Sequence, residues 1–489
     1  MKRRNSEKAP ETRSSAPGCA EEAVRRCLKI WKDHRIPVYS LVLLRHGRTE
    51  LELYSPPFER TSLHRFYSVT KSLTSLAVGC LADEGRLKLD DGICGYFPEW
   101  VPEPVPEWLA KTTIRDMLRM ESCHSKTTYK LDMKENWTAS FFRVPPDHRP
   151  GTLFCYDTSA THTLCALVEK LTGRPLLSYL REKFLDELGF SPGTYCLTDP
   201  FGTTIAGGGL MARPEDMAKL GQLLLQRGSW NGRQLLPEWY LKEALTKQVS
   251  TAGRAENRFQ SRGYGYQFWM LPDGAFAAWG KAGQLMAVFP REEAVLIMNA
   301  DTGYVKAGDQ VLIETACREL IPEGTRDGKV VCRGDFLPLR PVLKEIEGMP
   351  DSPIRAEVNR ARFVFPGEGW LASSVLAFDE AGDGGEWHFN DREGKCRRIR
   401  FGITSVHTER AEWNSELYGA SAAWTDERTF FMEIRLLELE VSTIRVHLVF
   451  SVDDFGIVDG CTVWMENTTE TPVIDFSGCF SGTREKVRQ

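Results

Sequence analysis

The chain of 489 residues has no long hydrophobic run and no excess of positive charge. A membrane-spanning helix needs about 20 mainly apolar residues, and no segment supplies them. The formal net charge is −5 and the pI is about 6.1, so no broad basic surface is expected for nucleic acid or an anionic membrane. The composition therefore predicts a soluble globular protein whose partners include neither nucleic acid nor a membrane.

Disulfide and metal-binding patterns are also missing. The cysteines number 13 and include no Cys-x-x-Cys pair, and the 9 histidines form no His-Glu-x-x-His motif. We expect reduced thiols, no metal and no other cofactor. Residues 1–20 are polar and lack the apolar stretch of a secretory signal, so they are predicted to be a disordered tail of a cytoplasmic protein.

The length exceeds what one hydrophobic core usually supports, and two domains are expected. Residues 21–320 mix helices and strands, which predicts an α/β (α+β) domain whose sheet joins strands distant in sequence. Residues 321–353 are rich in Gly, Pro and charge and are interpreted as a linker. Residues 354–489 consist of short strands separated by turns, as in an all-β barrel or sandwich. Five tryptophans of this last segment are assigned to its core: Trp370, Trp387, Trp413, Trp424 and Trp464.

Within residues 21–320 the hydrophobic periodicity predicts individual elements. Helices are expected from Glu21, from Ser68 to Gly85, over 113–120 and 159–171, after Pro214 and Pro237, and over 310–320. Strands are expected over 38–44, with a hairpin return after His46-Gly47, and over 264–269, 276–279, 286–289 and 294–298.

Ser68 and Lys71 stand one helical turn apart at the start of an amphipathic segment. Residues at i and i+3 share a helix face, so an uncharged Lys71 is placed to take the proton of Ser68. Tyr156, on a Gly-containing loop before the helix predicted over 159–171, is a candidate for a second proton-transfer group. These three residues are the predicted catalytic set.

Four ordered segments resemble the serine β-lactamase and penicillin-binding-protein-like hydrolases, in particular the branch of class C β-lactamases, esterases and 6-aminohexanoate-dimer hydrolases. They are Phe66 to Ser72, which contains the Ser-x-x-Lys motif; Tyr156-Asp157-Thr158, in place of Tyr-x-Asn; Gly207 to Met211; and Tyr264 to Trp269. The resemblance covers residues 22–320. It implies a transpeptidase-like fold with an antiparallel sheet between helices.

The family's third motif, Lys/His-x-Gly on a strand, is altered here. Two registers remain open: Ala278-Trp279-Gly280, which lacks the cation, and Lys281-Ala282-Gly283, which has it. Thr158 in place of Asn is a second departure. In β-lactamases these groups hold the substrate amide and carboxylate, so the departures argue against β-lactam hydrolysis.

The mechanism that the resemblance implies proceeds through an acyl-enzyme on Ser68, formed from a small-molecule ester or amide. Lys71 and Tyr156 transfer protons, and which of them is the base in acylation stays open. The backbone N–H groups of Ser68 and Lys281 hold the oxyanion, and Gly280, Thr158 and Trp279 are expected beside the substrate. A homodimer is left open.

Two alternatives belong to other functional classes. A domain of this kind that has lost activity could serve as a binding or regulatory module, and the altered third motif would suit that. The segment Arg45-His46-Gly47 resembles the phosphate-binding motif of histidine phosphatases, with His46 as the phosphorylated residue. Such enzymes need a second histidine late in the same domain, and the segment from His162 to residue 320 contains none beyond His162 itself.

Overall fold

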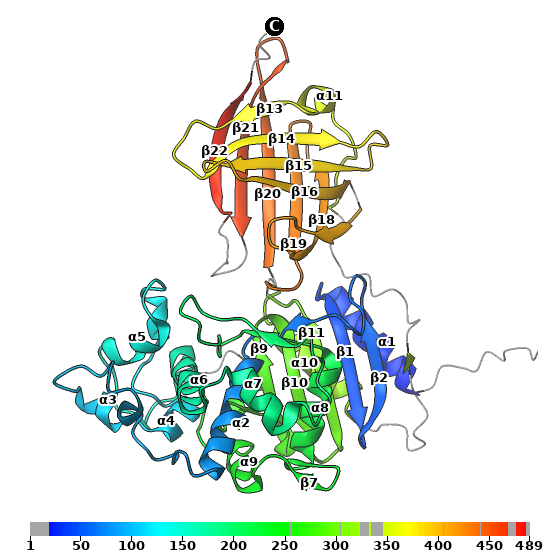
Figure 1. Cartoon of the computed structure of the whole chain (residues 1–489). Helices are drawn as coiled ribbons and strands as arrows, with labels where there is room; N and C mark the ends of the chain where they lie inside the picture. Colours follow the sequence, from blue (N-terminus) through cyan, green and yellow to red (C-terminus); the bar gives the residue numbers. More distant parts are fainter. Residues whose placement is uncertain are drawn as a thin grey trace, which may run out of the picture.

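A computed structural model describes residues 19–254, 257–303, 305–322, 332–333, 346–403, 405–440, 442–467 and 476–485, with 19–20 and 332–333 described by their backbone alone. Residues 1–18 of the predicted tail and most of the predicted linker lie outside the described residues. The described chain forms an α/β part, residues 19–322 with 332–333, and a C-terminal barrel, residues 346–485, which stands above it in Figure 1. Among the described residues no helix is long and apolar enough to cross a membrane.

The α/β part is organised around one seven-stranded sheet. Its strands follow the order β12-β2-β1-β11-β10-β9-β8. All neighbours pair antiparallel except β12 and β2, which are parallel. The bounds are β1 (Val38–Arg45), β2 (Arg48–Tyr54), β8 (Trp269–Met270), β9 (Phe276–Gly280), β10 (Gln284–Phe289), β11 (Ala294–Ala300) and β12 (Cys332–Arg333). The expected antiparallel sheet that joins distant strands is confirmed.

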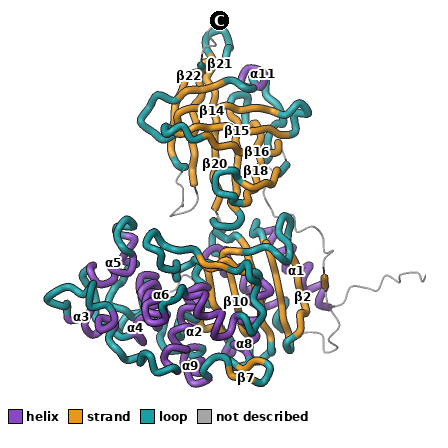
Figure 2. The backbone as a smooth tube through the Cα atoms, in the orientation of Figure 1, coloured by secondary structure: helices purple, strands orange, loops and turns teal. Residues whose placement is uncertain are grey.

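Helices cover both faces of this sheet, and small hairpins connect some of them (Figures 1 and 2). The helices are α1 (Cys19–Asp33), α2 (Val69–Asp83), α3 (Glu107–Lys111), α4 (Ile114–Leu118), α5 (Trp137–Arg143), α6 (Thr158–Thr172), α7 (Leu176–Leu180), α8 (Pro214–Leu225), α9 (Glu238–Ala244) and α10 (Gly308–Glu319). The short strands outside the main sheet are β3 (His64–Arg65), β4 (Tyr195–Cys196), β5 (Leu210–Ala212), β6 (Ser229–Trp230) and β7 (Arg233–Gln234).

Two hydrophobic cores lie on opposite faces of the sheet. One contains the apolar residues of α2, α6 and α8, and the other those of α1 and α10. Since neighbouring strand residues point to opposite faces, β9 places Ala278 in the first core and Trp279 in the second. Burial on both faces explains why the central strands are continuous apolar runs in the sequence.

The segment predicted as a strand over 264–269 is instead a loop, apart from its last residue. Gln267 has a φ of 65°, which interrupts any extended run. Its amide Nε2 donates to the carbonyls of Met117 and Leu118 at 3.1 and 2.9 Å, and the Ser72 hydroxyl donates to the Gln267 carbonyl at 2.7 Å. This loop therefore connects α2 to α4 through hydrogen bonds of Gln267. Hydrophobic periodicity in the sequence does not predict such polar contacts.

The C-terminal part is a barrel, which resolves the choice between barrel and sandwich. Its strand order is β16-β15-β14-β13-β22-β21-β20-β19-β18, closed by a parallel pairing of β16 with β18, and β17 adds to β18 outside this ring. The bounds are α11 (Arg355–Val358), β13 (Arg362–Val364), β14 (Leu371–Phe378), β15 (Gly384–Asp391), β16 (Cys396–Ile403), β17 (His407–Arg410), β18 (Leu417–Trp424), β19 (Thr429–Leu436), β20 (Ser442–Val452), β21 (Val458–Asn467) and β22 (Gly478–Arg484). Strands β17 and β22 were not predicted from the sequence.

The tryptophans of the barrel do not share one environment. Trp387 and Trp424 are fully buried in its core, and Trp370 and Trp413 pack against the core while partly exposed. Trp464 is 49% exposed, so its assignment to the core is wrong. Its neighbours on β21, Val463 and Met465, fill the interior, and the alternation of a strand then directs Trp464 outward.

This difference predicts unequal stability costs for two tryptophan substitutions. We expect Trp387→Ala to lower the free energy of unfolding of the barrel by about 3–5 kcal/mol, because it leaves a large cavity. Trp464→Ala should cost within about 0.5 kcal/mol, as is usual for exposed positions. Urea denaturation of the full chain, followed by near-ultraviolet circular dichroism, measures both. Equal shifts in the two variants would contradict the assigned orientation of β21.

Candidate active site

Ser68 occupies the turn that leads from β3 into α2. It precedes the first helical residue, Val69, and its side chain is half-buried. The residue before it, Tyr67, has a φ of 45°, an uncommon conformation for a residue with a side chain. The turn is held by Gly208, where a Cβ would lie 3.3 Å from the Tyr67 Cα. A strained backbone is thus maintained directly beside Ser68, as is frequent at functional sites.

Lys71 lies beside Ser68 on the first turn of α2 and is 1% exposed. Its Nζ donates to the Ser68 Oγ at 2.9 Å and to the Gly207 carbonyl at 2.9 Å. Burial lowers the pKa of Lys71 to about 7; the charge of Asp157 acts in the opposite direction, and that of Lys130 lowers the pKa further. A substantial neutral fraction of Lys71 near pH 7 can therefore accept a proton from Ser68.

Asp157 is fully buried between Tyr156 and α6, where it caps the helix. Its carboxylate accepts hydrogen bonds from the N–H groups of Ser159 at 2.8 Å and Ala160 at 3.2 Å. Burial raises its pKa to about 6, although these hydrogen bonds favour the charged form. Tyr156 and Thr158 were predicted as site residues from the sequence, but the intervening Asp157 was not. The position of Asp157 directly before a predicted helix, where aspartate commonly caps the first turn, could have identified it.

Tyr156 projects from the loop before α6 toward Lys71. The Lys71 Nζ lies 5.0 Å from the centre of its ring, and the ring stacks on Trp269 with centroids 5.5 Å apart. The Tyr156 side chain is 37% exposed, so it lies at the border between the buried lysine and solvent. The fold therefore brings Ser68, Lys71 and Tyr156 together from elements nearly ninety positions apart in the chain.

The end of β9 adjoins the Ser68 turn. A Cβ on Gly280 would lie 2.3 Å from the Phe66 carbonyl oxygen, so only glycine permits this approach. Ala278 faces the α2 side of the sheet and is buried, which leaves no cation there. Lys281 is exposed and begins a 3-10 turn, Lys281–Gly283, whose Gly283 packs near Leu312 of α10. The register Ala278-Trp279-Gly280 fits this geometry.

Trp279 does not line the site, and this expectation is wrong. Its ring lies in the core between the sheet and α10, where its Nε1 donates to Asp309 at 3.1 Å. The reason is strand alternation: with Ala278 facing α2, the next residue must face the opposite side. Thr158 is the first residue of α6, and its methyl group would be 2.2 Å from a Cβ on Gly207.

Arg65 connects this site with the barrel. Its Nε donates to the Gly208 carbonyl at 2.8 Å, and its Nη1 donates to the Leu439 carbonyl at 2.6 Å. Leu439 belongs to the barrel loop between β19 and β20. The buried Glu416 holds the backbone of this loop: one of its carboxylate oxygens accepts hydrogen bonds from the N–H groups of residues 438, 439 and 440 at 3.0, 2.8 and 3.2 Å. Through Arg65 the barrel is thus connected to the turn before β5 that carries Gly207 and Gly208.

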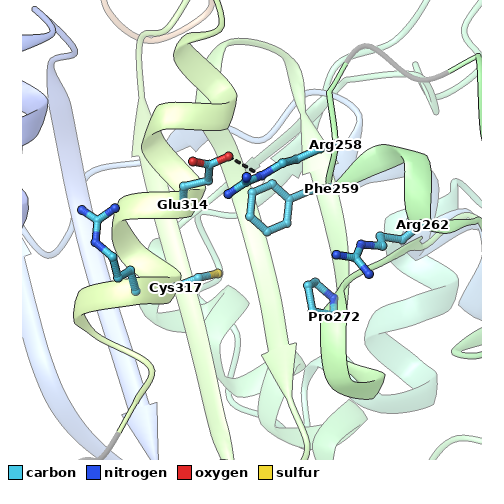
Figure 3. Close-up of a pocket in the computed structure, with 7 residues that line it drawn as sticks. Arg258, Phe259, Arg262, Pro272, Glu314 and Cys317 are labelled. Atoms are coloured by element: carbon cyan, nitrogen blue, oxygen red, sulfur yellow. Dashed lines mark ion pairs between the residues drawn. The ribbon is translucent and has the colours of Figure 1, made fainter.

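A separate pocket of about 500 Å³ lies between α10 and the segment around residues 258–272 (Figure 3). Arg258 and Glu314 form an ion pair of 2.5 Å at its rim. Cys317 also lines it, but burial raises the pKa of this thiol to about 12, so a reactive thiolate is not available at neutral pH. This pocket therefore offers no nucleophile comparable to Ser68.

His46 lies in the β1–β2 turn, as the hairpin interpretation expected. Its side chain is 67% exposed and its Nδ1 lies 2.8 Å from Glu293. His162 is buried on α6 against Asp199, at 3.1 Å. The two histidines therefore contact different carboxylates in different surroundings, and the geometry offers no support for phosphotransfer at His46.

The fold and these residues agree with a match to known proteins. Residues 21–314, well over half of the chain, match the family described as Beta-lactamase. The chain therefore belongs to the β-lactamase family, a family of hydrolases.

Individual relatives are distant. The 6-aminohexanoate-dimer hydrolase of Paenarthrobacter ureafaciens is 23% identical over 279 residues, which cover 53% of this chain and 71% of that protein. A solved structure of a putative 6-aminohexanoate-dimer hydrolase from Bacillus anthracis has a TM-score of 0.51 and 22% identity, covering 60% of this chain and 82% of the other. The octameric penicillin-binding protein homologue from Pyrococcus abyssi has a TM-score of 0.50 and 16% identity and covers 94% of this chain and 99% of its own. These structures share the fold.

The burial of Lys71 predicts the pH dependence of Ser68 reactivity. Below its pKa of about 7 the lysine carries its proton and cannot accept another; above it the neutral amine can. We expect the rate of Ser68 labelling by a fluorophosphonate to rise with pH and to reach half its maximum near pH 7. Lys71→Met, which cannot accept a proton, should lower the rate by at least about 100-fold. A pH-independent rate in the wild-type protein would contradict the assigned role of Lys71.

Proposed function

We propose that this protein is a serine hydrolase that cleaves a small-molecule ester or amide through an acyl-enzyme on Ser68. The observation that carries the proposal is the 2.9 Å contact between the Lys71 Nζ and the Ser68 Oγ, made by a lysine that is 1% exposed. A neutral amine beside a hydroxyl can act as the adjacent base that activates serine as a nucleophile.

In the first step the Ser68 Oγ bonds to the substrate carbonyl carbon while neutral Lys71 takes the hydroxyl proton. The carbonyl oxygen becomes an oxyanion, which we assign to the backbone N–H groups of Ser68 and Lys281 at the end of β9. Collapse of this intermediate breaks the bond to the leaving alcohol or amine. Tyr156 donates a proton to that group and recovers one from Lys71.

In the second step water attacks the acyl group. Lys71 and Tyr156 accept the water proton and return a proton to the Ser68 Oγ. The bond between Ser68 and the acyl group then breaks, which releases the carboxylic acid and regenerates the enzyme. No net oxidation or reduction occurs. The 6-aminohexanoate-dimer hydrolase relative is consistent with a linear amide substrate, while the exposed Tyr156 and the adjacent Trp269 favour an acyl or leaving group with an apolar portion.

The nucleophile is tested by replacing Ser68 with alanine. We expect Ser68→Ala to abolish fluorophosphonate labelling and to lower kcat/KM for acyl p-nitrophenyl esters by at least about 1,000-fold, since no other group forms the acyl bond. Ser62→Ala, a half-buried serine in the preceding loop, is the matched control and should retain wild-type rates. Labelling of Ser68→Ala at the wild-type rate would show that Ser68 is not the nucleophile. No labelling of the wild-type protein would support an inactive binding module instead.

The neutral side chain at Ala278 predicts poor turnover of β-lactams. A substrate carboxylate that finds no cation there loses a charged hydrogen bond of about 1.5–3 kcal/mol, or roughly 10- to 100-fold in binding. We expect kcat/KM for nitrocefin to lie at least that far below the value for p-nitrophenyl butyrate. Rapid nitrocefin hydrolysis that disappears in Ser68→Ala would show that another group replaces the missing cation.

A further inference from the structure

Arg65, the last residue of β3, makes three contacts that meet beside the nucleophile. Its Cζ lies 4.6 Å from the centre of the Tyr67 ring, within the range of a cation–π contact. Its Nε donates to the Gly208 carbonyl at 2.8 Å, and its Nη1 donates to the Leu439 carbonyl at 2.6 Å. One guanidinium therefore bridges the barrel and the turn that carries Ser68.

Two of these contacts go to the two sides of a close backbone approach. Tyr67 has a φ of 45° directly before the nucleophile, and a Cβ on Gly208 would lie 3.3 Å from the Tyr67 Cα. Arg65 binds the ring on one side of this approach and the carbonyl on the other. Because a strained backbone persists only where its surroundings hold it, Arg65 is placed to maintain the conformation before Ser68.

The turn at Gly208 also carries an acceptor for both reacting side chains. The carbonyl of the preceding residue, Gly207, accepts hydrogen bonds from the Lys71 Nζ at 2.9 Å and from the Ser68 hydroxyl at 3.2 Å. A shift of this turn would therefore change the environment of the base and of the nucleophile together. Arg65 restrains the turn through the next carbonyl in the chain.

The barrel offers Arg65 a loop whose backbone is already fixed. The N–H of residue 437 donates to the Leu417 carbonyl at 3.0 Å, and Glu416 accepts the next three N–H groups. All four N–H groups of residues 437–440 are thus bound within the barrel. The Leu439 carbonyl, in contrast, accepts its hydrogen bond from Arg65 of the α/β part.

An apolar contact docks the same loop on the α/β part. Leu437 is 1% exposed and is buried in a small cluster with Tyr39 and Phe58. The Phe58 ring lies 4.9 Å from that of Tyr39 and 4.6 Å from that of His64, which precedes Arg65 in β3. The loop therefore contacts the α/β part twice near β3, once through an apolar side chain and once through a carbonyl.

We propose that Arg65 is a positioning residue for the hydrolase reaction, which uses the barrel loop of residues 437–440 as a fixed support to hold Tyr67 and Gly208 together beside Ser68. The proposal rests on the proposed function, because it assigns the bridge a part in the acylation of Ser68. It extends that function by giving the barrel a role in it: the barrel supports the turn from which the nucleophile projects.

The role of the guanidinium is tested with Arg65→Met in the full-length protein, labelled with a fluorophosphonate over a range of concentrations. We expect the maximal labelling rate to fall at least about 10-fold, as for the loss of a hydrogen bond to a charged group. The half-saturating concentration should change less than about twofold, since Arg65 acts on the position of Ser68 and not on probe binding. A maximal rate equal to that of the wild-type protein would overturn the proposal.

Arg60→Met is the matched control. Arg60 lies in the loop before β3, is 54% exposed and pairs with Glu52 at 2.9 Å and with Glu215 at 2.8 Å. Its replacement removes the same charge from the same part of the chain without touching the bridge, so labelling should proceed at the wild-type rate. An equal loss in Arg60→Met and Arg65→Met would show a general effect of charge and overturn the proposal.

A double-mutant cycle tests whether Arg65 acts through the barrel. Leu437→Ala removes the side chain that docks the loop, and we expect it to lower the maximal labelling rate about 3- to 10-fold when Arg65 is present. In the Arg65→Met background the same change should alter the rate by less than about twofold. Leu448→Ala, at a buried position of the barrel core on β20, is the control for lost stability and should leave the rate unchanged. Additive losses from Leu437→Ala and Arg65→Met would overturn the bridge.

Amide hydrogen exchange separates this proposal from the proposed function. The Gly208 N–H donates to the Ile205 carbonyl at 3.1 Å, so its exchange reports opening of the turn. We expect exchange in peptides that cover residues 203–212 to accelerate at least about fivefold in Arg65→Met and to stay unchanged in Arg60→Met. No acceleration overturns the Arg65 proposal whether or not the protein is active. Acceleration in a protein whose wild-type form no fluorophosphonate labels would instead contradict the proposed function and confirm only the bridge.

Discussion

The site depends on the burial of one amine. Lys71 is buried, and among the described residues its Nζ has two hydrogen-bond partners, the Ser68 hydroxyl and the Gly207 carbonyl; this burial disfavours the charged ammonium. The surrounding elements maintain that condition: α2 is buried along nearly its whole length, and the loop around Gln267 binds it to its neighbours through the Ser72 hydroxyl. If water reached Lys71 freely, its pKa would return toward that of an ordinary lysine and the base would be protonated near neutrality.

Gly207 links the chemistry to the rest of the molecule. Its carbonyl accepts hydrogen bonds from the Lys71 Nζ and the Ser68 hydroxyl. A side chain at this position would collide with Thr158. The next carbonyl in the chain, that of Gly208, accepts a hydrogen bond from Arg65. Because Arg65 also binds the Leu439 carbonyl, the barrel loop is connected to the turn beside the nucleophile. The barrel therefore contributes to the surroundings of the site through the backbone carbonyl of Leu439.

The interpretation of the chain from sequence was accurate where a local pattern has a single structural meaning. The helix predicted over 159–171, observed as Thr158–Thr172, and the strands over 38–44, 276–279, 286–289 and 294–298 follow from periodicity and caps. It was wrong where the same pattern has two outcomes. Tyr264 to Trp269 alternates like a strand but forms a loop, because buried carbonyls of α4 are satisfied by the Gln267 amide. Trp464 was assigned to the core by residue type, although its strand neighbours occupy the interior.

The sequence alone determined the chemical groups of the site, the family and the division into a mixed part and an all-β part, because these depend on residue types and short spacings. The tertiary structure alone decided how those groups interact. Ala278 and Trp279 are adjacent in the chain yet lie in different cores, because β9 directs neighbouring side chains to opposite faces of the sheet. The loss of water around Lys71 arises from segments that meet only on folding, and long-range packing of this kind leaves no periodic signal in the sequence.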